Sequence, residues 1–151
     1  MEQYRGHALR KGRVSISGQI YLITVVSRKR KPIFFNLGAA RILVKELYSN
    51  SLDVETLCYV IMPDHLHWLV RLGDEVSLSA LMQQVKSKSG FYIKKLLGLK
   101  EPVWQSGSHD RALRKDEDVK KVARYVIANP LRAGLVVRVE DYALWDVCWL
   151  G

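Results

Sequence analysis

The chain has 151 residues, of which 48% are hydrophobic and 26% are charged. This balance is typical of one soluble globular domain and excludes a disordered, fibrous or disulfide-dependent protein. Its 24 lysines and arginines exceed the 15 acidic residues and give a formal charge of +9. Nucleic acid is therefore the leading candidate partner, although many small soluble proteins are basic for no specific reason.

The cysteines and the N-terminal segment carry little functional information. Cys58 and Cys148 lie far apart, without the spacing of metal ligands, and we expect both to be buried thiols. Residues 1–13 are polar and basic with no apolar run behind them, and no segment approaches the length needed to cross a bilayer. We therefore expect a cytoplasmic protein with one domain over residues 1–151, a basic N-terminal arm and a C-terminal tail.

The first half of the chain predicts a strand, a helix and a hairpin. Residues 19–26 are rich in β-branched and aromatic residues, which favours a central strand. Apolar side chains recur with helical spacing over residues 39–48. Two strand-like runs, residues 54–62 and 65–72, are separated by a Pro-Asp pair that favours a tight turn, so they form a predicted hairpin.

The next segment predicts a long helix and a short strand. Helical spacing returns over residues 77–97, where Gly90 could divide the helix. A fourth strand is expected around residues 103–104 or 111–114.

The remainder of the chain completes the predicted fold. A third helix is expected over residues 116–129, opened by acidic residues that suit its positive end and closed before Pro130. Residues 131–151 should pack back on the domain as a tail. The order strand, helix, hairpin, helix, strand, helix predicts a ferredoxin-like α+β sandwich, with helices on one face of an antiparallel sheet. The other face would then be open to a ligand.

The first candidate site is the pair His65 and His67. Residues two apart in a strand point the same way, so the two imidazoles should converge and could hold a divalent metal if a third ligand joined them. The alternative is a pair of half-exposed strand histidines with no ligand.

The second candidate site is on the predicted third helix. Its apolar stripe should face the core, which leaves Tyr125 to one side and Asn129 one turn further along on that same side. Simpler explanations exist for both residues: Tyr125 as a boundary tyrosine with a solvated hydroxyl, and Asn129 as a helix terminator before Pro130.

Together these residues suggest a phosphoryl-transfer site. A phenol is a poor nucleophile at neutral pH, but a cation beside the target phosphate would polarise it and favour the phenolate. His65, His67 and the amide oxygen of Asn129 would leave coordination positions open for phosphate oxygens. Such ligands permit magnesium or manganese, and imidazole does not exclude zinc.

Three stretches of the sequence resemble a known family. Residues 59–69, YVIMPDHLHWL, resemble the HUH motif of single-tyrosine transposases, including its Met-Pro-Asp-His lead-in. Residues 104–118 and 123–135 resemble the C-terminal signature of the REP-associated branch. With Tyr4-Arg5 and the strand at 19–26, the likeness to REP-associated tyrosine transposases covers nearly the whole chain.

The resemblance implies a role for each candidate residue. His65 and His67 would bind the metal, Tyr125 would attack a DNA phosphorus, and Asn129 would complete the metal shell where related transposases carry glutamine. The tyrosine would displace a 3′-hydroxyl and keep the 5′ end as a phosphotyrosine ester, in a reversible reaction without ATP. The family acts on single-stranded DNA with hairpins, in this branch the repetitive extragenic palindromes.

The chain also departs from the family in the loop before the third helix. It carries Ser108 and Arg111 where the family often has an aromatic residue and a histidine. His109 and Asp110 could position the helix or touch DNA, and we expect the structural role.

Basic residues are the candidate DNA contacts. They gather in the N-terminal arm, in the loop after the first strand and on the second helix. There they could contact the DNA backbone, and the alternative is an ordinary charged surface facing solvent. The predicted contacts are Arg5, Arg10, Lys11, Arg13, Arg28, Arg30, Lys86 and Lys88.

Other interpretations of the function stay open at this point. One alternative is a non-catalytic nucleic-acid-binding module on the same fold, although the aromatic consensus of RNA-binding sheets is missing. Another is a domesticated relative with the same chemistry in the service of the host. The protein could be a monomer or a homodimer with shared active sites.

Overall fold

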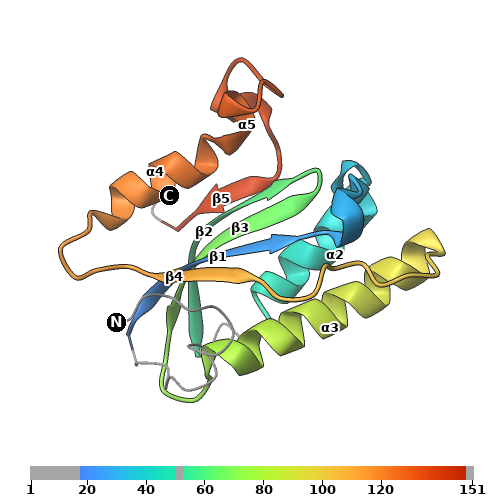
Figure 1. The fold of residues 1–151 in the computed structure, drawn as a ribbon. Coiled ribbons are helices and arrows are strands. Elements are labelled where there is room, and N and C mark those ends of the chain that lie inside the picture. Colours follow the sequence, from blue (N-terminus) through green and yellow to red (C-terminus); the bar gives the residue numbers. More distant parts are fainter. Residues whose placement is uncertain (1–17, 50–52, 149–151) are drawn as a thin grey trace.

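The computed structural model describes residues 18–49 and 53–148, which form a five-stranded antiparallel sheet flanked by helices (Figure 1). The strand order is β4-β1-β3-β2-β5. The strands are β1 (Ile20–Val26), β2 (Val54–Met62), β3 (His65–Leu72), β4 (His109–Ala112) and β5 (Trp145–Val147). The helices are α2 (Leu37–Leu47), α3 (Leu78–Leu97), α4 (Val119–Ile127) and α5 (Asn129–Arg132), with 3-10 turns at Arg28–Arg30, Ile33–Phe35 and Val139–Asp141.

The larger core lies between one face of the sheet and the helices α2 and α3. Alternate strand residues such as Ile23, Ile61 and Trp68 point into it and are fully or almost fully buried. The Asn36 and Ser77 side chains cap α2 and α3 by accepting hydrogen bonds from backbone N–H groups in the first turn. The predicted ferredoxin-like α+β class is therefore confirmed.

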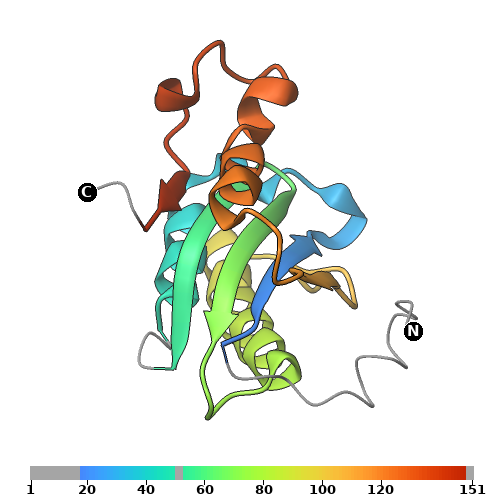
Figure 2. The same cartoon turned by 90° about the vertical axis from the view of Figure 1, so that its left-hand side faces the viewer.

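A second, smaller core lies on the opposite face, where α4 packs on the sheet. Ala123 and Val126 of α4 are buried against a cluster that includes Val60 of β2 and Leu69 of β3. Figure 2 shows α4 in front of the sheet and α2 and α3 behind it. The expectation that the helices lie on one face and leave the other open is therefore wrong where α4 packs, because its apolar stripe needs cover and the first face is already occupied by α2 and α3.

Several predicted boundaries differ from the observed ones. The helix α3 runs unbroken through Gly90, which lies against the Trp104 indole, where an added Cβ would be 3.6 Å away. The fourth strand begins at His109, and Trp104 forms only an isolated bridge with Ser27. Pro130 does not end the chain's helical course: it lies in the first turn of α5, where a missing backbone N–H costs little.

The C-terminal tail packs back on the sheet, as predicted. The strand β5 extends the sheet by pairing with β2, and the Tyr142 hydroxyl donates a hydrogen bond to the Ile61 carbonyl at 2.6 Å. Trp149, in the last part of the predicted tail, lies outside the described residues.

The two cysteine side chains differ in their exposure to solvent. Cys58 is buried as predicted, whereas the prediction for Cys148 is wrong, because it is exposed just beyond the short edge strand β5. Within residues 18–49 and 53–148, no helix is long and apolar enough to cross a membrane.

Candidate active site on the α4 face of the sheet

The two histidines lie side by side on β3, between β1 and β2. His65 and His67 alternate with Leu66 and Trp68, which point into the larger core, so both imidazoles face the α4 side of the sheet. Their ring centroids are 4.8 Å apart and the ring planes are nearly perpendicular, at 85°. The predicted convergence of the two rings is confirmed.

A side-chain partner orients each imidazole through its Nδ1 atom. The Asp64 carboxylate lies 2.7 Å from His65 Nδ1, and because a carboxylate only accepts, the contact places a ring proton on Nδ1, so that the neutral tautomer has its lone pair on Nε2. The Thr24 hydroxyl lies 3.0 Å from His67 Nδ1 and orients the second ring. This is how metal-binding histidines are usually held, with Nε2 left for the ion.

The protonation states also suit a metal site. Burial first, and then the charges of His65 and Arg132, lower the pKa of His67 to about 4, so its ring is neutral at physiological pH. Burial opposes ionisation of Asp64, but hydrogen bonds from His65 and Arg30 outweigh it and hold the pKa below its usual value. At neutral pH the site therefore pairs the neutral imidazole of His67 with the ionised carboxylate of Asp64.

The loop after β1 brings Arg30 onto Asp64. Lys29 and Arg30 have φ angles of 56° and 53°, a left-handed conformation that is uncommon outside glycine. The buried Ser27 hydroxyl lies 2.7 Å from the Lys31 carbonyl and 3.0 Å from that of Asp64, which ties the loop to the hairpin turn. Arg30 Nη1 then donates to Asp64 Oδ2 at 2.8 Å. Arg30, predicted as a DNA contact, is thus part of the histidine surroundings.

Tyr125 projects from α4 on the same side of the sheet as the histidines. Its side chain is exposed, at 65%, while Ala123 and Val126 anchor the helix. The Arg132 guanidinium lies 3.7 Å above the centre of the Tyr125 ring and donates a hydrogen bond to the Tyr125 carbonyl at 2.8 Å. The charge of Arg132 is also one of the causes, after burial and His65, that lower the pKa of His67.

Asn129 lies at the bend between α4 and α5. It is partly buried, and its amide nitrogen donates to the Val126 carbonyl at 2.7 Å, which leaves the side-chain oxygen as the remaining acceptor. The expected extension of α4 to this residue is wrong, because α4 ends at Ile127 and Asn129 begins α5. The short α5 contacts β2, the strand next to the histidines.

The available donors fit a metal with open coordination positions. Among the described residues, no three His, Cys, Asp or Glu side chains form a cluster that could hold an ion. A metal on the two Nε2 atoms would therefore need an amide oxygen, such as that of Asn129, and oxygens from water or phosphate. Such a shell suits a cation that binds its substrate directly.

The segment before α4 carries a third histidine and an anchoring arginine. His109 of β4 pairs across the sheet with Thr24, which in turn pairs with His67, so all three lie in one row on the same face. His109 is exposed, two strands away from His67. Arg111 donates to the Glu117 carboxylate at 2.9 Å and ties β4 to the turn before α4, while the structural role expected of His109 and Asp110 stays a prediction.

Two of the remaining predicted DNA contacts, Arg28 and Lys86, donate hydrogen bonds to other groups of the protein. Arg28 donates to Glu101 at 3.2 Å, and the Lys86 ammonium donates to the carbonyls of Gln105 and Gly107 at 3.0 and 2.8 Å, respectively. The four predicted contacts in the N-terminal arm lie outside the described residues: Arg5, Arg10, Lys11 and Arg13.

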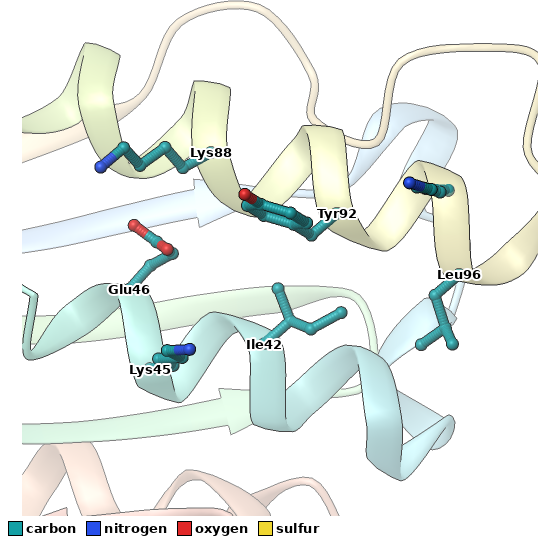
Figure 3. A pocket seen from close by; sticks show the side chains of 7 residues that line it. Ile42, Lys45, Glu46, Lys88, Tyr92 and Leu96 are labelled. Carbon is teal, nitrogen blue, oxygen red and sulfur yellow. The ribbon is translucent and has the colours of Figure 1, made fainter.

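Lys88 lies away from the histidines. It lines a cavity of about 590 Å³ between α2 and α3, which cover the opposite face of the sheet (Figure 3). The other lining residues are Ile42, Lys45, Glu46, Tyr92, Lys95 and Leu96. The sheet therefore separates this cavity from the candidate active site.

Sequence reasoning missed four residues that surround the candidate site: Thr24, Arg30 as an ion-pair partner, Asp64 and Arg132. Asp64 is adjacent to His65, and a carboxylate next to a candidate metal ligand was a usable signal. Thr24 and Arg132 had none, because their contacts depend on strand register and on the α4–α5 bend.

Known proteins with similar sequences and structures point to one family. Residues 15–129 match the family described as "Transposase IS200 like". The chain is 27% identical over 149 residues to the REP-associated tyrosine transposase of Escherichia coli K12, and this match covers 94% of this chain and 80% of that protein. It is also similar to the structure of a REP-associated tyrosine transposase bound to a REP hairpin, with a TM-score of 0.71 and 23% identity over 96% of this chain and 82% of that one. The resemblance to REP-associated tyrosine transposases is confirmed, and this chain belongs to the IS200-like transposase family of DNA-processing enzymes.

Proposed function

We propose that this protein cleaves and rejoins single-stranded, hairpin-containing DNA through a 5′-phosphotyrosine intermediate on Tyr125. His65, His67 and Asn129 would hold the divalent metal, magnesium or manganese. One observation carries the proposal: the exposed phenol of α4 and the paired imidazoles of β3 lie on the same face of the sheet. Strand transfer through a covalent intermediate needs a nucleophile on the same side of the protein as the site for phosphate.

The reaction exchanges one phosphodiester for another. The Tyr125 oxygen forms a bond to phosphorus as the bond to the 3′ oxygen breaks, and the phenolic proton passes to solvent while the departing 3′ oxygen takes one up. Neither ATP nor a redox partner is needed, and attack by a 3′-hydroxyl on the phosphotyrosine reverses the step. When bound, the metal would polarise the phosphate and favour the phenolate.

The residues around the histidines would keep the metal ligands ready. Asp64 selects the His65 tautomer whose lone pair is on Nε2, and the low pKa of His67 keeps that ring neutral. His67 therefore has no proton to lose when a metal binds.

The DNA partner is proposed from the family and from charge. The similar transposase structure contains a REP hairpin, and the net charge of +9 favours a polyanion. Backbone contacts by the N-terminal arm, Arg28, Lys86 and Lys88 remain predictions. Arg30 is proposed mainly as the partner of Asp64, because that ion pair occupies one edge of its guanidinium.

The test is the formation of a covalent protein–DNA adduct. The protein is incubated with a hairpin-bearing single strand and Mn²⁺, and adducts are separated on a denaturing gel. We expect an adduct with the wild type and with Tyr92→Phe, a matched exposed tyrosine on the other face, and none with Tyr125→Phe or with chelator. DNA binding by all variants without any adduct would instead support the non-catalytic binding module.

A further inference from the structure

Arg132 is held against the proposed nucleophile by two separate contacts. Its guanidinium stacks at 3.7 Å on the Tyr125 ring, and Nη1 donates to the Tyr125 carbonyl at 2.8 Å. The first contact is a cation–π interaction, and the second fixes the guanidinium relative to the α4 backbone. The side chain is nevertheless exposed, so neither contact arises from burial.

The bend between α4 and α5 builds this arrangement. The Ala128 N–H donates to the Arg124 carbonyl and the Arg132 N–H donates to the Ala128 carbonyl, so the helical course resumes after a short irregularity. Asn129 braces the bend through Val126, and the buried Pro130 anchors α5 to the domain. A residue seven positions after Tyr125 thereby returns to its ring.

The guanidinium of Arg132 keeps donors free beside the Tyr125 ring. A guanidinium has five N–H donors in a planar fork, and the bond to the Tyr125 carbonyl uses one of them. The others suit the oxygens of a phosphodiester, which would have to lie between Tyr125 and the imidazoles to react.

We propose that Arg132 is a clamp for the reaction: it fixes the Tyr125 ring by stacking and donates hydrogen bonds to the phosphodiester that Tyr125 attacks. This inference rests on the proposed function, because it requires Tyr125 to be the nucleophile. A stacked ring has fewer orientations to lose on reaching the transition state, and a second cation at the phosphate stabilises the charge that develops there.

The test compares three variants in single-turnover adduct formation with saturating hairpin DNA and Mn²⁺. Arg132→Ala should lower the rate on the order of 100-fold, as expected for a lost donor to a developing oxyanion. Arg132→Lys keeps the charge but loses the planar stack and the fork, and should recover only part of the rate. The matched control Arg124→Ala removes the same charge from the exposed surface of α4 and should stay near the wild-type rate.

Chemical rescue separates a direct role from a structural one. Guanidinium ions at concentrations below those that unfold the protein should restore part of the rate of Arg132→Ala and none of that of Tyr125→Phe. A wild-type rate in Arg132→Ala, a full rate in Arg132→Lys, or a lost rate that guanidinium does not restore would each overturn the clamp while the proposed function stands. An adduct with Tyr125→Phe would overturn the proposed function itself.

Discussion

Asp64→Asn should weaken metal binding without unfolding the protein. Asp64 accepts a hydrogen bond from His65 Nδ1 at 2.7 Å with one oxygen and from Arg30 Nη1 at 2.8 Å with the other. An asparagine side chain has one carbonyl oxygen and one NH2 group, so the NH2 group must face either His65 or Arg30. If the NH2 group faces His65, it donates to Nδ1, and the ring proton then lies on Nε2, where it blocks the metal position.

The expected size follows from what the best alternative retains. With its carbonyl turned to His65, the variant keeps a neutral acceptor, and hydrogen bonds to ionised groups are roughly twice as strong as neutral ones. Losing such an orienting group typically weakens metal binding by about 10-fold to 100-fold. Arg30 is 62% exposed, so Arg30→Gln should have a smaller effect, about threefold or less.

Calorimetric titration with Mn²⁺ measures this prediction, and thermal unfolding followed by circular dichroism checks the fold. Glu101→Gln is the matched control, because Glu101 also pairs with an arginine of the loop after β1, Arg28, but does not contact a histidine. Mn²⁺ affinity of Asp64→Asn within twofold of the wild type, or an equal loss in Glu101→Gln, would refute the reasoning.

Three further predictions concern the packing of α4, a buried hydrogen bond and the exposure of the thiols. Val126→Ala removes two methyl groups from the buried side of α4 and should lower the free energy of unfolding by about 2 kcal/mol in urea titration; a loss below about 0.5 kcal/mol would mean that α4 is anchored elsewhere. Ser89→Ala leaves the buried Trp104 indole N–H, which donates to Ser89 Oγ at 3.0 Å, without its acceptor, at a cost of about 1–3 kcal/mol, and an unchanged denaturation midpoint would contradict this. In the native protein, a thiol reagent should modify Cys148 quickly and Cys58 slowly, because burial and then the nearby Cys148 raise the pKa of Cys58 to about 12. Mass spectrometry of the digested protein measures the two rates, and faster modification of Cys58 would contradict the prediction.

The sequence by itself determined the local elements and the direction of their side chains. A strand repeats every two residues, so the HLH segment had to present two imidazoles on one face, and the hairpin of β2 and β3 has the predicted bounds. A helix repeats every 3.6 residues, so the apolar stripe of α4 left Tyr125 exposed. The family resemblance then supplied roles that these repeats do not carry.

The tertiary structure alone decided how these elements meet. α4 packs on the face of the sheet that α2 and α3 leave uncovered, and no local sequence pattern encodes which face that is. Thr24 reaches His67 across 43 positions of the chain through strand register, and Arg132 reaches Tyr125 through the bend that Asn129 and Pro130 stabilise. Contacts of this kind arise from packing between distant segments, where the gain in burial and hydrogen bonding outweighs local preference. The two imidazoles and the exposed Tyr125 were therefore predictable from the chain, whereas the contacts of Thr24 with His67 and of Arg132 with Tyr125 required the fold.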